Sequence, residues 1–240
     1  MPSTVIQLRQ FYASPLGRRV KQRLRQQVMA CWGGSGAQET VVGLGYAVPL
    51  LRVLERSQPA ALMAFMPAAQ GAIYWPVHSE NHSVLGDLLM PPFAPGSLHR
   101  VLMLHALEHV ARPGELLNVY WQMLAPGGRL LMVVPNRRGY WANVDNTPFA
   151  LGTPFSLGQL KELLAEARFT LSHVSDALYA PPTSRKMWLR LWPLLERLGR
   201  FCFPGMGGVL ILEAEKQIYA SIPEPVKDWV PAAAVKISAA

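Results

Sequence analysis

The sequence is short of cysteine, of charged residues and of long hydrophobic runs. Its two cysteines, Cys31 and Cys202, lie far apart in apolar and aromatic surroundings, which predicts buried, reduced thiols rather than a disulfide framework or a metal site. No uninterrupted apolar stretch reaches the roughly 20 residues of a membrane-spanning helix. The first ten residues also lack the basic and apolar regions of a secretory signal. We therefore expect a cytoplasmic protein.

Acidic residues are scarcer than basic ones. The chain has 15 Asp and Glu against 23 Lys and Arg, a formal net charge of +8. Such an excess attracts nucleic acid, anionic lipid or an acidic protein surface, and because no nucleic-acid module is recognisable, the first is the weakest of the three. His78 and His82 lie four residues apart, but Pro76 disfavours a helix there and no third ligand is in view, so no metal site is predicted.

The 240 residues, 50% of them hydrophobic, are enough for one well-buried core. Short apolar runs predict strands, and stripes of apolar residues predict helices between them. The predicted strands are 40–44, 60–66, 83–85, 100–104, 129–134, 169–174 and 208–215, and the predicted helices are 47–56, one that opens at Pro113 and one capped by Ser156 and Gln159. In 67–81, prolines and a glycine indicate that a crossover helix is shortened or lost. The alternation predicts a single α/β domain with a doubly wound, mostly parallel sheet.

Two segments outside this alternation are basic and amphipathic. Residues 1–37 hold a helix that begins after Ser14, with an apolar face and several arginines on its other faces. Residues 183–203 mix tryptophan and leucine with arginine, which predicts a lid helix kinked at Pro193, a protein-docking surface or a peripheral membrane helix. Residues 38–217 then form the main domain, and 218–240 read as an extended C-terminal tail, a third candidate contact for a protein partner.

Two stretches in the middle of the chain carry a recognisable succession of motifs. They read GDLLMPPFAPGSLHRVLMLHALEHV, from Gly86 to Val110, and LAPGGRLLMVVPN, from Leu124 to Asn136. The acidic residue after a strand, the Pro-Phe pair, the Leu-Glu-His-Val run and the Pro-Gly-Gly turn come in the order and spacing of a known family. The chain resembles the class I methyltransferases of the large bacterial family labelled type 11, over roughly Gln38 to Lys216.

This resemblance implies a Rossmann-like fold and a site for S-adenosylmethionine at the carboxyl ends of the strands. The matching positions for cofactor contacts are Gly43, Gly45 and Tyr46 in the turn after the first strand, Asp87 and Leu88 after the third, and His105 after the fourth. In the family, the acidic side chain at the position of Asp87 and the next backbone amide hold the adenine edge. The other reading of Asp87 is a cap of the turn before Pro91.

The chain also departs from the family at two places. The family usually has an acidic residue where this chain has Gly43, and further glycines where it has Ala47 and Pro49. The family also ends its second strand with a carboxylate that accepts hydrogen bonds from the ribose hydroxyls, whereas this chain has Phe65, Met66 and Pro67. The contacts for the methionyl end and for the ribose are therefore altered.

Methyl transfer from a sulfonium depends mainly on alignment of the acceptor in a site that excludes water. If the acceptor is a hydroxyl or an acid, His105 is the first candidate for a base, since imidazole titrates near neutrality. Glu108 and His109 read as scaffold of the Leu-Glu-His-Val run. Aromatic residues that could enclose an acceptor are Tyr12, Tyr46, Tyr140, Trp141 and Trp188.

Two hypotheses remain open from the sequence. The first is an S-adenosylmethionine-dependent methyltransferase that acts on a small or lipid-like acceptor beneath the 183–203 insertion. The second is a methyltransferase-like protein that has lost cofactor affinity and serves as a binding protein or partner subunit. The intact stretch from Asp87 to Asn136 favours the first hypothesis, and the altered turn and missing ribose carboxylate favour the second.

Overall fold

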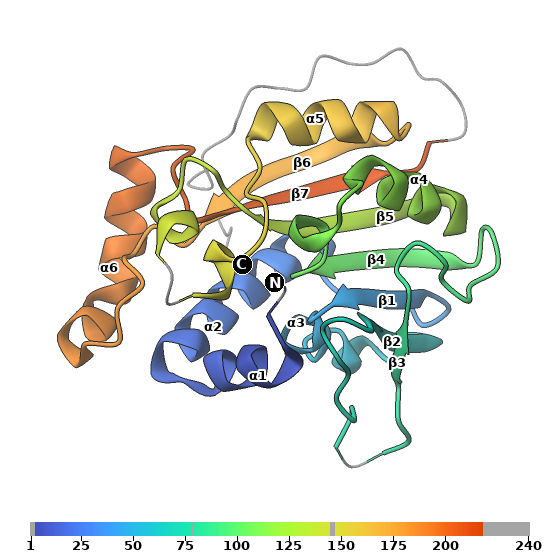
Figure 1. The fold of residues 1–240 in the computed structure, drawn as a ribbon, viewed down its shortest axis with the longest axis horizontal. Helices are drawn as coiled ribbons and strands as arrows, with labels where there is room; N and C mark the ends of the chain where they lie inside the picture. Colours follow the sequence, from blue (N-terminus) through green and yellow to red (C-terminus); the bar gives the residue numbers. More distant parts are fainter. Residues whose placement is uncertain (1–2, 78, 145–146, 218–240) are drawn as a thin grey trace, which may run out of the picture.

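A seven-stranded sheet forms the centre of the computed structural model, which describes residues 3–77, 79–144 and 147–217 (Figure 1). The strands are β1 (Thr40–Gly45), β2 (Ala61–Pro67), β3 (Ser83–Gly86), β4 (Leu98–Leu104), β5 (Leu124–Pro135), β6 (Thr170–Ala177) and β7 (Val209–Glu215). The α-helices are α1 (Val5–Ala13), α2 (Pro15–Trp32), α3 (Val48–Leu51), α4 (Pro113–Met123), α5 (Leu157–Glu166) and α6 (Lys186–Cys202). Short 3-10 turns are η1 (Glu55–Ser57), η2 (Leu107–His109), η3 (Tyr140–Asn143) and η4 (Pro148–Ala150). The predicted tail, residues 218–240, and His78 lie outside the described residues.

The strand order is β3-β2-β1-β4-β5-β7-β6. The first five strands pair in parallel, and β7 pairs antiparallel with both β5 and β6. The order changes direction between β1 and β4, which is where ligands bind in open α/β sheets. The prediction of a doubly wound, mostly parallel sheet is confirmed.

Helices cover both faces of the sheet, and each face has its own core. Alternate residues of β4 point to opposite faces, so Leu102 and Leu104 pack with α1, α2 and α3, whereas Val101 and Met103 pack with α4 and α5. Because both faces are buried, the middle strands read as unbroken apolar runs in the sequence. Figure 1 shows the two helical layers on either side of the sheet.

The first helix was not predicted from the sequence. The cap at Ser14 is confirmed, with its hydroxyl accepting from the backbone N–H of Gly17, but it begins α2 rather than the first helix. A shorter helix, α1, precedes it and has its own capping box, in which Thr4 and Gln7 exchange hydrogen bonds. This helix places Tyr12 in the core.

The helix after β1 is much shorter than predicted. We expected it to span 47–56, but α3 contains only four residues and is followed by a separate 3-10 turn at η1. Pro49 lies within α3, and after Leu51 the backbone N–H groups of Val53 and Leu54 donate to carbonyls only three residues back, at Leu50 and Leu51. The described residues between β2 and β3 contain no helix, as predicted. The described residues of the two connections from β1 to β3 therefore contain only the one short α-helix, α3.

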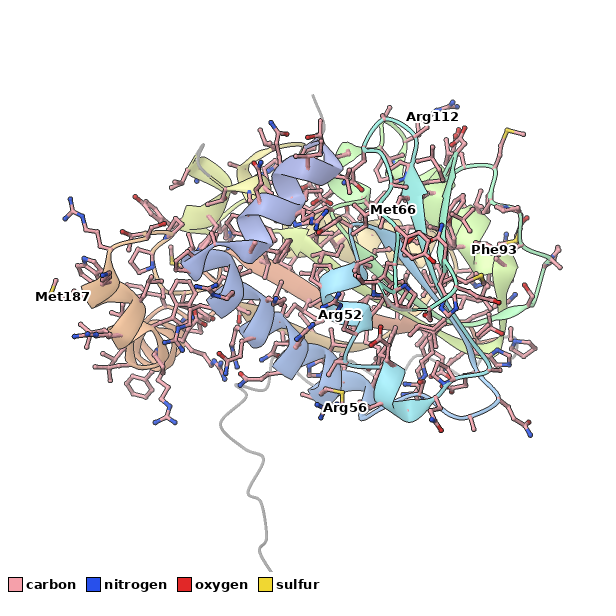
Figure 2. The ribbon with its side chains drawn as sticks, turned by 90° about the horizontal axis from the view of Figure 1, so that it is seen from below. Arg52, Arg56, Met66, Phe93, Arg112 and Met187 are labelled. Carbon is pink, nitrogen blue, oxygen red and sulfur yellow. The ribbon has the colours of Figure 1, made fainter. Side chains whose placement is uncertain are left out.

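The insertion between the last strands is confirmed as a helix, α6, which contains Pro193 in its interior. It buries Leu189, Trp192 and Glu196 and exposes its opposite side, where Met187 projects outward (Figure 2). The carboxylate of Glu196 accepts a hydrogen bond from the backbone N–H of Ala180 at 3.0 Å, which fixes α6 to the segment after β6.

The prediction of buried thiols is met in part by Cys31, which is half-buried against the core, and is wrong for Cys202. Burial raises the pKa of the Cys31 thiol to about 12, so that thiol is protonated and inert. Cys202 is exposed at the end of α6 because the last turn of this helix leaves the core. Among the described residues, no helix is long and apolar enough to cross a membrane, and no group of three or more histidine, cysteine or acidic side chains is placed to bind a metal ion.

Candidate cofactor and acceptor site

The carboxyl ends of β1 and β4 meet closely at Gly45. This residue has φ +70°, and a Cβ on it would lie 2.5 Å from the carbonyl oxygen of Leu104 and 2.6 Å from that of His105. Only glycine combines that backbone conformation with so close an approach. Gly45 and Tyr46 therefore form a tight turn at the point where the strand order changes direction.

His105 follows β4 and lies fully buried at this edge. Its φ of +53° is unusual for a residue with a side chain, and such backbone conformations concentrate at functional sites. Its Nε2 shares a hydrogen bond of 2.9 Å with the hydroxyl of Tyr12. On its other side, Nδ1 lies 3.3 Å from Oε1 of Glu108. The three side chains thus form a buried row of hydroxyl, imidazole and carboxylate.

The contact between His105 and Glu108 has the separation of an ion pair without the geometry of a hydrogen bond. Accordingly, Nδ1 of His105 and both carboxylate oxygens of Glu108 have no hydrogen-bond partner among the described residues. Unsatisfied buried carboxylate oxygens are costly. A proton on Nδ1 would face this carboxylate, which favours the imidazole tautomer that leaves Nε2 free to accept from a hydroxyl.

Aromatic rings enclose this row. Tyr12 stacks on Tyr46 with ring centroids 5.8 Å apart, and Phe149 lies 4.8 Å from the ring of His105. Trp141 contacts Phe149 at 5.8 Å and Trp192 of α6 at 5.9 Å. A continuous line of rings therefore connects α6 to the buried histidine.

The phenols of this enclosure are neutral. Burial, followed by electrostatic repulsion from the neighbouring Tyr46 and Glu108, raises the pKa of Tyr12 well above its usual range. Burial also raises the pKa of Tyr46. The pKa of His109 is lowered, mainly by burial, so this neighbouring imidazole is held in its neutral form at neutral pH. Tyr12 consequently acts as a hydroxyl group toward His105, and not as a phenolate.

The segment after β2 closes the site from the other side. The amide of Gln70 donates to the carbonyl of His105 at 3.2 Å, and its backbone carbonyl accepts from Val5 of α1 at 2.7 Å. The side-chain oxygen of Gln70 is buried without a partner among the described residues. These contacts join three segments that lie far apart in the sequence.

Two positions that carry a carboxylate in the family are filled by apolar packing. A Cβ on Gly43 would lie 2.6 Å from Cδ1 of Leu51 and 2.7 Å from the Cβ of Ala47, so α3 occupies the space of a side chain there. At the end of β2, Met66 is fully buried among apolar residues. The carboxylate of Glu108 instead supplies buried negative charge at this edge.

The adenine position retains its acidic residue. Asp87 follows β3 and is exposed, with Oδ1 accepting from the backbone N–H of Leu89 at 2.9 Å, while Leu88 is buried. Its charge also adds to burial in raising the pKa of Tyr120 on α4. Asp87 therefore does cap its turn, as one of the two sequence readings had it, and its other carboxylate oxygen remains for a ligand.

The candidate acceptor residues separate into two groups. Tyr12 and Trp141 lie in the enclosure around His105. Tyr140 is 64% exposed, and Trp188 lies half-buried on α6, one turn before the residue that contacts Trp141. Gln70, Phe149 and Trp192 were not predicted, because their roles depend on packing between distant segments. The carboxylate of Glu108 had a visible signal, the Leu-Glu-His-Val run, and was read as scaffold only.

Comparison with known proteins agrees with this geometry. Residues 41–132 match the profile of the family described as Methyltransferase domain. This segment is a methyltransferase domain. The match includes the Gly45 turn, Asp87 and the buried row from His105 to Glu108, and stops within β5.

Sequence and structure neighbours are methyltransferases as well. A ubiquinone biosynthesis O-methyltransferase of a Caulobacter species is 32% identical over 123 residues, which are 50% of this chain and 44% of that protein. The chain thus spans less than half the length of this curated relative. A SAM-dependent methyltransferase of Thermotoga maritima superposes with TM-score 0.58 at 16% identity, covering 87% of this chain and 94% of that one. The class I methyltransferase fold is therefore shown.

One structural neighbour contains a cofactor product. The geranyl diphosphate C-methyltransferase of Streptomyces coelicolor was solved with S-adenosyl-L-homocysteine and superposes with TM-score 0.55 at 16% identity, covering 80% of this chain and 76% of that one. S-adenosylmethionine is the cofactor that goes with this domain. The residues of the present chain fit it in part: the Gly45 turn and Asp87 are in place, whereas Tyr12 and Gln70 fill the space beside His105.

Proposed function

We propose that this chain is an S-adenosylmethionine-dependent methyltransferase that acts on a hydroxyl group of a small or lipid-like acceptor. The observation that carries the proposal is the buried row of Tyr12, His105 and Glu108 at the carboxyl edge of β4. The Caulobacter relative is named as an O-methyltransferase, which supports a hydroxyl as the acceptor group.

The cofactor would contact the turn at Gly45 and Tyr46, Asp87 with the backbone of Leu88, and the vicinity of His105. Gly43 packs closely against α3 and in this way supports the turn. Bound S-adenosylmethionine supplies the methyl group as a sulfonium. Glu108 supplies a buried negative charge at the edge where the family carboxylate of the methionyl end is missing. The chain's own residues exclude water, because each of those around His105 is buried.

In this proposal His105 is the general base. The hydroxyl of Tyr12, 2.9 Å from Nε2, marks the position that an acceptor hydroxyl would occupy. The carboxylate of Glu108, 3.3 Å from Nδ1, favours a proton on that nitrogen, so Nε2 can take the proton of the acceptor as its oxygen becomes nucleophilic. Tyr12 must give up this position, through rotation of its side chain or a shift of α1.

A lipid-like acceptor is supported by α6. Its exposed side carries Met187, Leu191, Leu194, Leu198 and Phe201 at alternating spacings of four and three, so they share one face. Exposed basic residues, Lys186, Arg190 and Arg197, lie beside that face. A helix of this kind lies in the interface of an anionic membrane, and its buried Trp192 leads through Trp141 and Phe149 to His105.

One observation favours the second candidate function, a binding protein without cofactor affinity. Tyr12 and Gln70 occupy the edge of the sheet and join α1, the segment after β2 and the end of β4 by hydrogen bonds. A ligand at this edge has to displace both contacts. The two functions therefore differ in whether the side chain of Tyr12 leaves His105 in solution.

Calorimetric titration of the purified protein with S-adenosylmethionine and with S-adenosylhomocysteine separates the two. Micromolar binding of either is the expected result. No binding up to about 1 mM, a standard free energy weaker than about −4 kcal/mol, would exclude the enzyme for this chain and favour the binding protein.

Methyl transfer is then tested with labelled S-adenosylmethionine and a total lipid extract as the source of acceptors. The wild type is expected to label the extract, and His105→Asn is expected to reduce the rate by about 10²- to 10⁴-fold, the usual effect of losing a general base. Tyr140→Phe is the matched control, because this exposed side chain lies outside the enclosure. Equal rates for His105→Asn and wild type would contradict the role of His105.

A further inference from the structure

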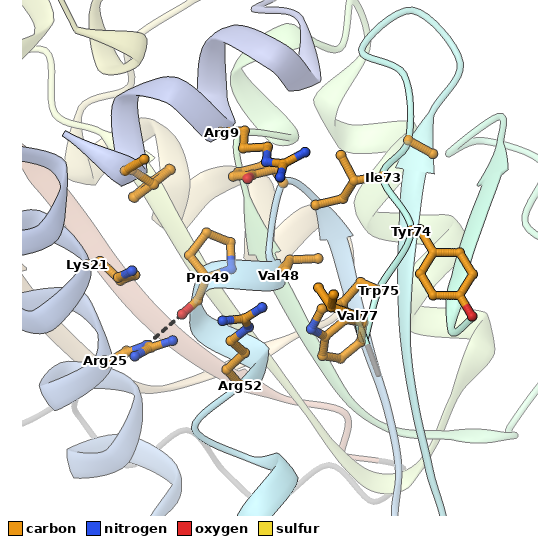
Figure 3. Close-up of a pocket in the computed structure, with 14 residues that line it drawn as sticks. Arg9, Lys21, Arg25, Val48, Pro49, Arg52, Ile73, Tyr74, Trp75 and Val77 are labelled. Atoms are coloured by element: carbon orange, nitrogen blue, oxygen red, sulfur yellow. Dashed lines mark hydrogen bonds between the residues drawn. The ribbon is translucent and has the colours of Figure 1, made fainter. Parts of the chain in front are cut away.

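A basic pocket lies beside α3 and adjoins the buried row at His105, since Tyr12 and Tyr46 are among the residues that line it. Its volume is about 570 Å³, and it is lined from α1, α2, α3 and residues 72–77. Four basic residues contribute to it: Arg9, Lys21, Arg25 and Arg52. In Figure 3, Lys21, Arg25 and Arg52 approach one another on one side of the pocket, and Arg9 lies across Val48 and Pro49 from them.

The positive charge of this pocket has no counterpart in its walls. None of the lining residues is acidic. Among the residues that the structure describes, none of the four basic side chains takes part in an ion pair. Arg25 is held in place by a hydrogen bond of 2.6 Å from Nε to the carbonyl of Pro49, which leaves the rest of its guanidinium toward Arg52. Like charges are thus fixed next to one another.

The proximity of these charges contributes to the lowered pKa values of Lys21 and Arg25. Burial, then the charges of Arg25, Arg52 and Arg18, lowers the pKa of Lys21. Burial and then the charge of Arg52 lower the pKa of Arg25, against a smaller opposite effect from Glu55. An arrangement of this kind is destabilising on its own, and an anion would relieve it.

A buried hydrogen-bond donor also faces the pocket. Trp75 lines it, is only 1% exposed and has an indole Nε1–H without a partner among the described residues. Its nitrogen faces the side on which Arg52 lies (Figure 3). An indole N–H can only donate, so the missing partner is an acceptor. The donor and the cations call for the same kind of ligand.

The shape of the chain explains why the pocket exists. Because α3 has only four residues and no helix is described between β2 and β3, the sheet is covered here by an irregular segment instead of packed helices. Val48, Ile73 and the ring of Trp75 add apolar walls to the cationic ones. The volume falls within the range of pockets for small organic ligands and exceeds the needs of a bare inorganic ion.

We propose that this pocket binds the phosphate group of a small organic phosphate, with Lys21, Arg25, Arg52 and the Nε1–H of Trp75 as its ligands. Arginine and lysine are the usual phosphate ligands in proteins, and the apolar walls accept the organic part. The phosphate belongs either to a soluble metabolite or to a lipid head group. This site does not depend on methyl transfer, and its test needs no S-adenosylmethionine.

The test is calorimetric titration with pyrophosphate, phenyl phosphate and dihexanoyl phosphatidic acid at 50 mM NaCl. Binding of phenyl phosphate is expected, and Arg52→Gln and Lys21→Gln are each expected to raise its Kd at least tenfold. Arg56→Gln is the matched control: it lies one turn further on, is exposed and does not line the pocket, and it should change the Kd less than twofold. Binding of phosphatidic acid without phenyl phosphate would assign the phosphate to a lipid.

Thermal unfolding provides a second readout that distinguishes ligand binding from a structural role. Without ligand, Arg52→Gln should raise Tm, because it removes a repelling charge. With 10 mM phenyl phosphate, the wild type should gain in Tm and Arg52→Gln should not. The proposal is overturned if none of the three compounds binds up to 10 mM, or if Arg52→Gln and Arg56→Gln weaken binding equally, since the effect would then be one of net charge alone.

Discussion

Gly45 and Gly96 share a left-handed backbone but differ in their surroundings. Gly45 has φ +70° and carbonyl oxygens 2.5 and 2.6 Å from the position of a Cβ, whereas Gly96 has φ +71° and nothing within 4 Å. Gly96→Ala should therefore cost about 1–2 kcal/mol, from backbone strain alone. Gly45→Ala should cost roughly 1–3 kcal/mol more, because β1 and β4 must move apart. Urea denaturation of both variants measures the difference, and equal losses would contradict the tight turn.

Gly43 allows the missing carboxylate to be tested directly. Gly43→Asp restores the acidic residue of the family, but its Cβ would lie 2.6 Å from Leu51, so we expect a loss of stability of several kcal/mol and no gain in cofactor affinity. Leu51→Ala removes this contact, while the Cβ of Ala47 would still lie 2.7 Å away. The double variant Gly43→Asp/Leu51→Ala should be more stable than Gly43→Asp alone and should bind S-adenosylhomocysteine more tightly than Leu51→Ala alone.

Urea denaturation of the four proteins, wild type included, completes this double-mutant cycle for stability. Calorimetric titration with S-adenosylhomocysteine completes it for affinity. Leu51→Ala by itself should lose about 2–5 kcal/mol of stability, since it leaves a cavity in the core. Additive effects on stability would show that Leu51 does not occupy the space of the carboxylate.

At the scale of elements, Glu196 couples the attachment of α6 to pH. Burial raises the pKa of this carboxyl to about 7, although Nε of Arg23 lies 3.6 Å away and Ala180 donates to it. Between pH 4.5 and pH 7 the folded protein therefore binds a proton that the unfolded chain does not. The free energy of unfolding should fall as pH rises through this window, by up to about 3 kcal/mol.

Glu196→Gln removes this dependence while keeping an acceptor for Ala180. Denaturant unfolding at several pH values should show a shallower decline for the variant than for the wild type. Glu115→Gln is the control, because Glu115 forms an exposed pair with Arg112 and should keep the slope of the wild type. If the free energy of unfolding of Glu196→Gln falls with pH as steeply as that of the wild type, the proton binds to another group.

Elements with a local signal were predictable and those that depend on packing were not. The capping box of Ser156 and Gln159 fixed the start of α5, and the Pro-Gly-Gly turn marked the region of β5. Helix α1 has only nine residues, and a helix this short is marginal without tertiary contacts. The apolar pattern in the sequence predicted a helix over 47–56, which is longer than α3. The apolar residues after α3 still pack into the core, although they lie in an irregular turn.

At the scale of the whole molecule, the site combines residues that no local pattern connects. His105 and the motif positions around it follow strand ends, so their common location was predictable from strand order alone. Tyr12 lies 93 residues from His105, and Gln70 reaches the same histidine from the segment after β2. Their meeting depends on how α1 lies across the sheet. The sequence therefore predicts the site residues at the strand ends, and only the structure reveals that Tyr12 and Gln70 cover them.

The net charge of +8 and the exposed face of α6 together predict binding to anionic membranes. Five apolar side chains on this face, from Met187 to Phe201, are each more than 40% exposed, and the face carries no exposed acidic residue of α6. Apolar insertion contributes about 1.5–3 kcal/mol for each buried leucine, and each basic residue near an anionic surface adds about 1 kcal/mol. Vesicles with phosphatidylglycerol should thus bind more protein than vesicles of phosphatidylcholine.

Vesicle sedimentation with Leu194→Ser/Leu198→Ser tests this prediction. These leucines are 52% and 50% exposed, so the variant should keep its stability within about 1 kcal/mol while its partition onto anionic vesicles falls at least tenfold. Ile6→Ser is the control, because Ile6 is 64% exposed on α1, outside the face of α6. If the double variant binds as the wild type does, the face of α6 does not contact lipid. If the double variant still binds at low salt and high salt abolishes this binding, charge brings the protein to the membrane without insertion of apolar side chains.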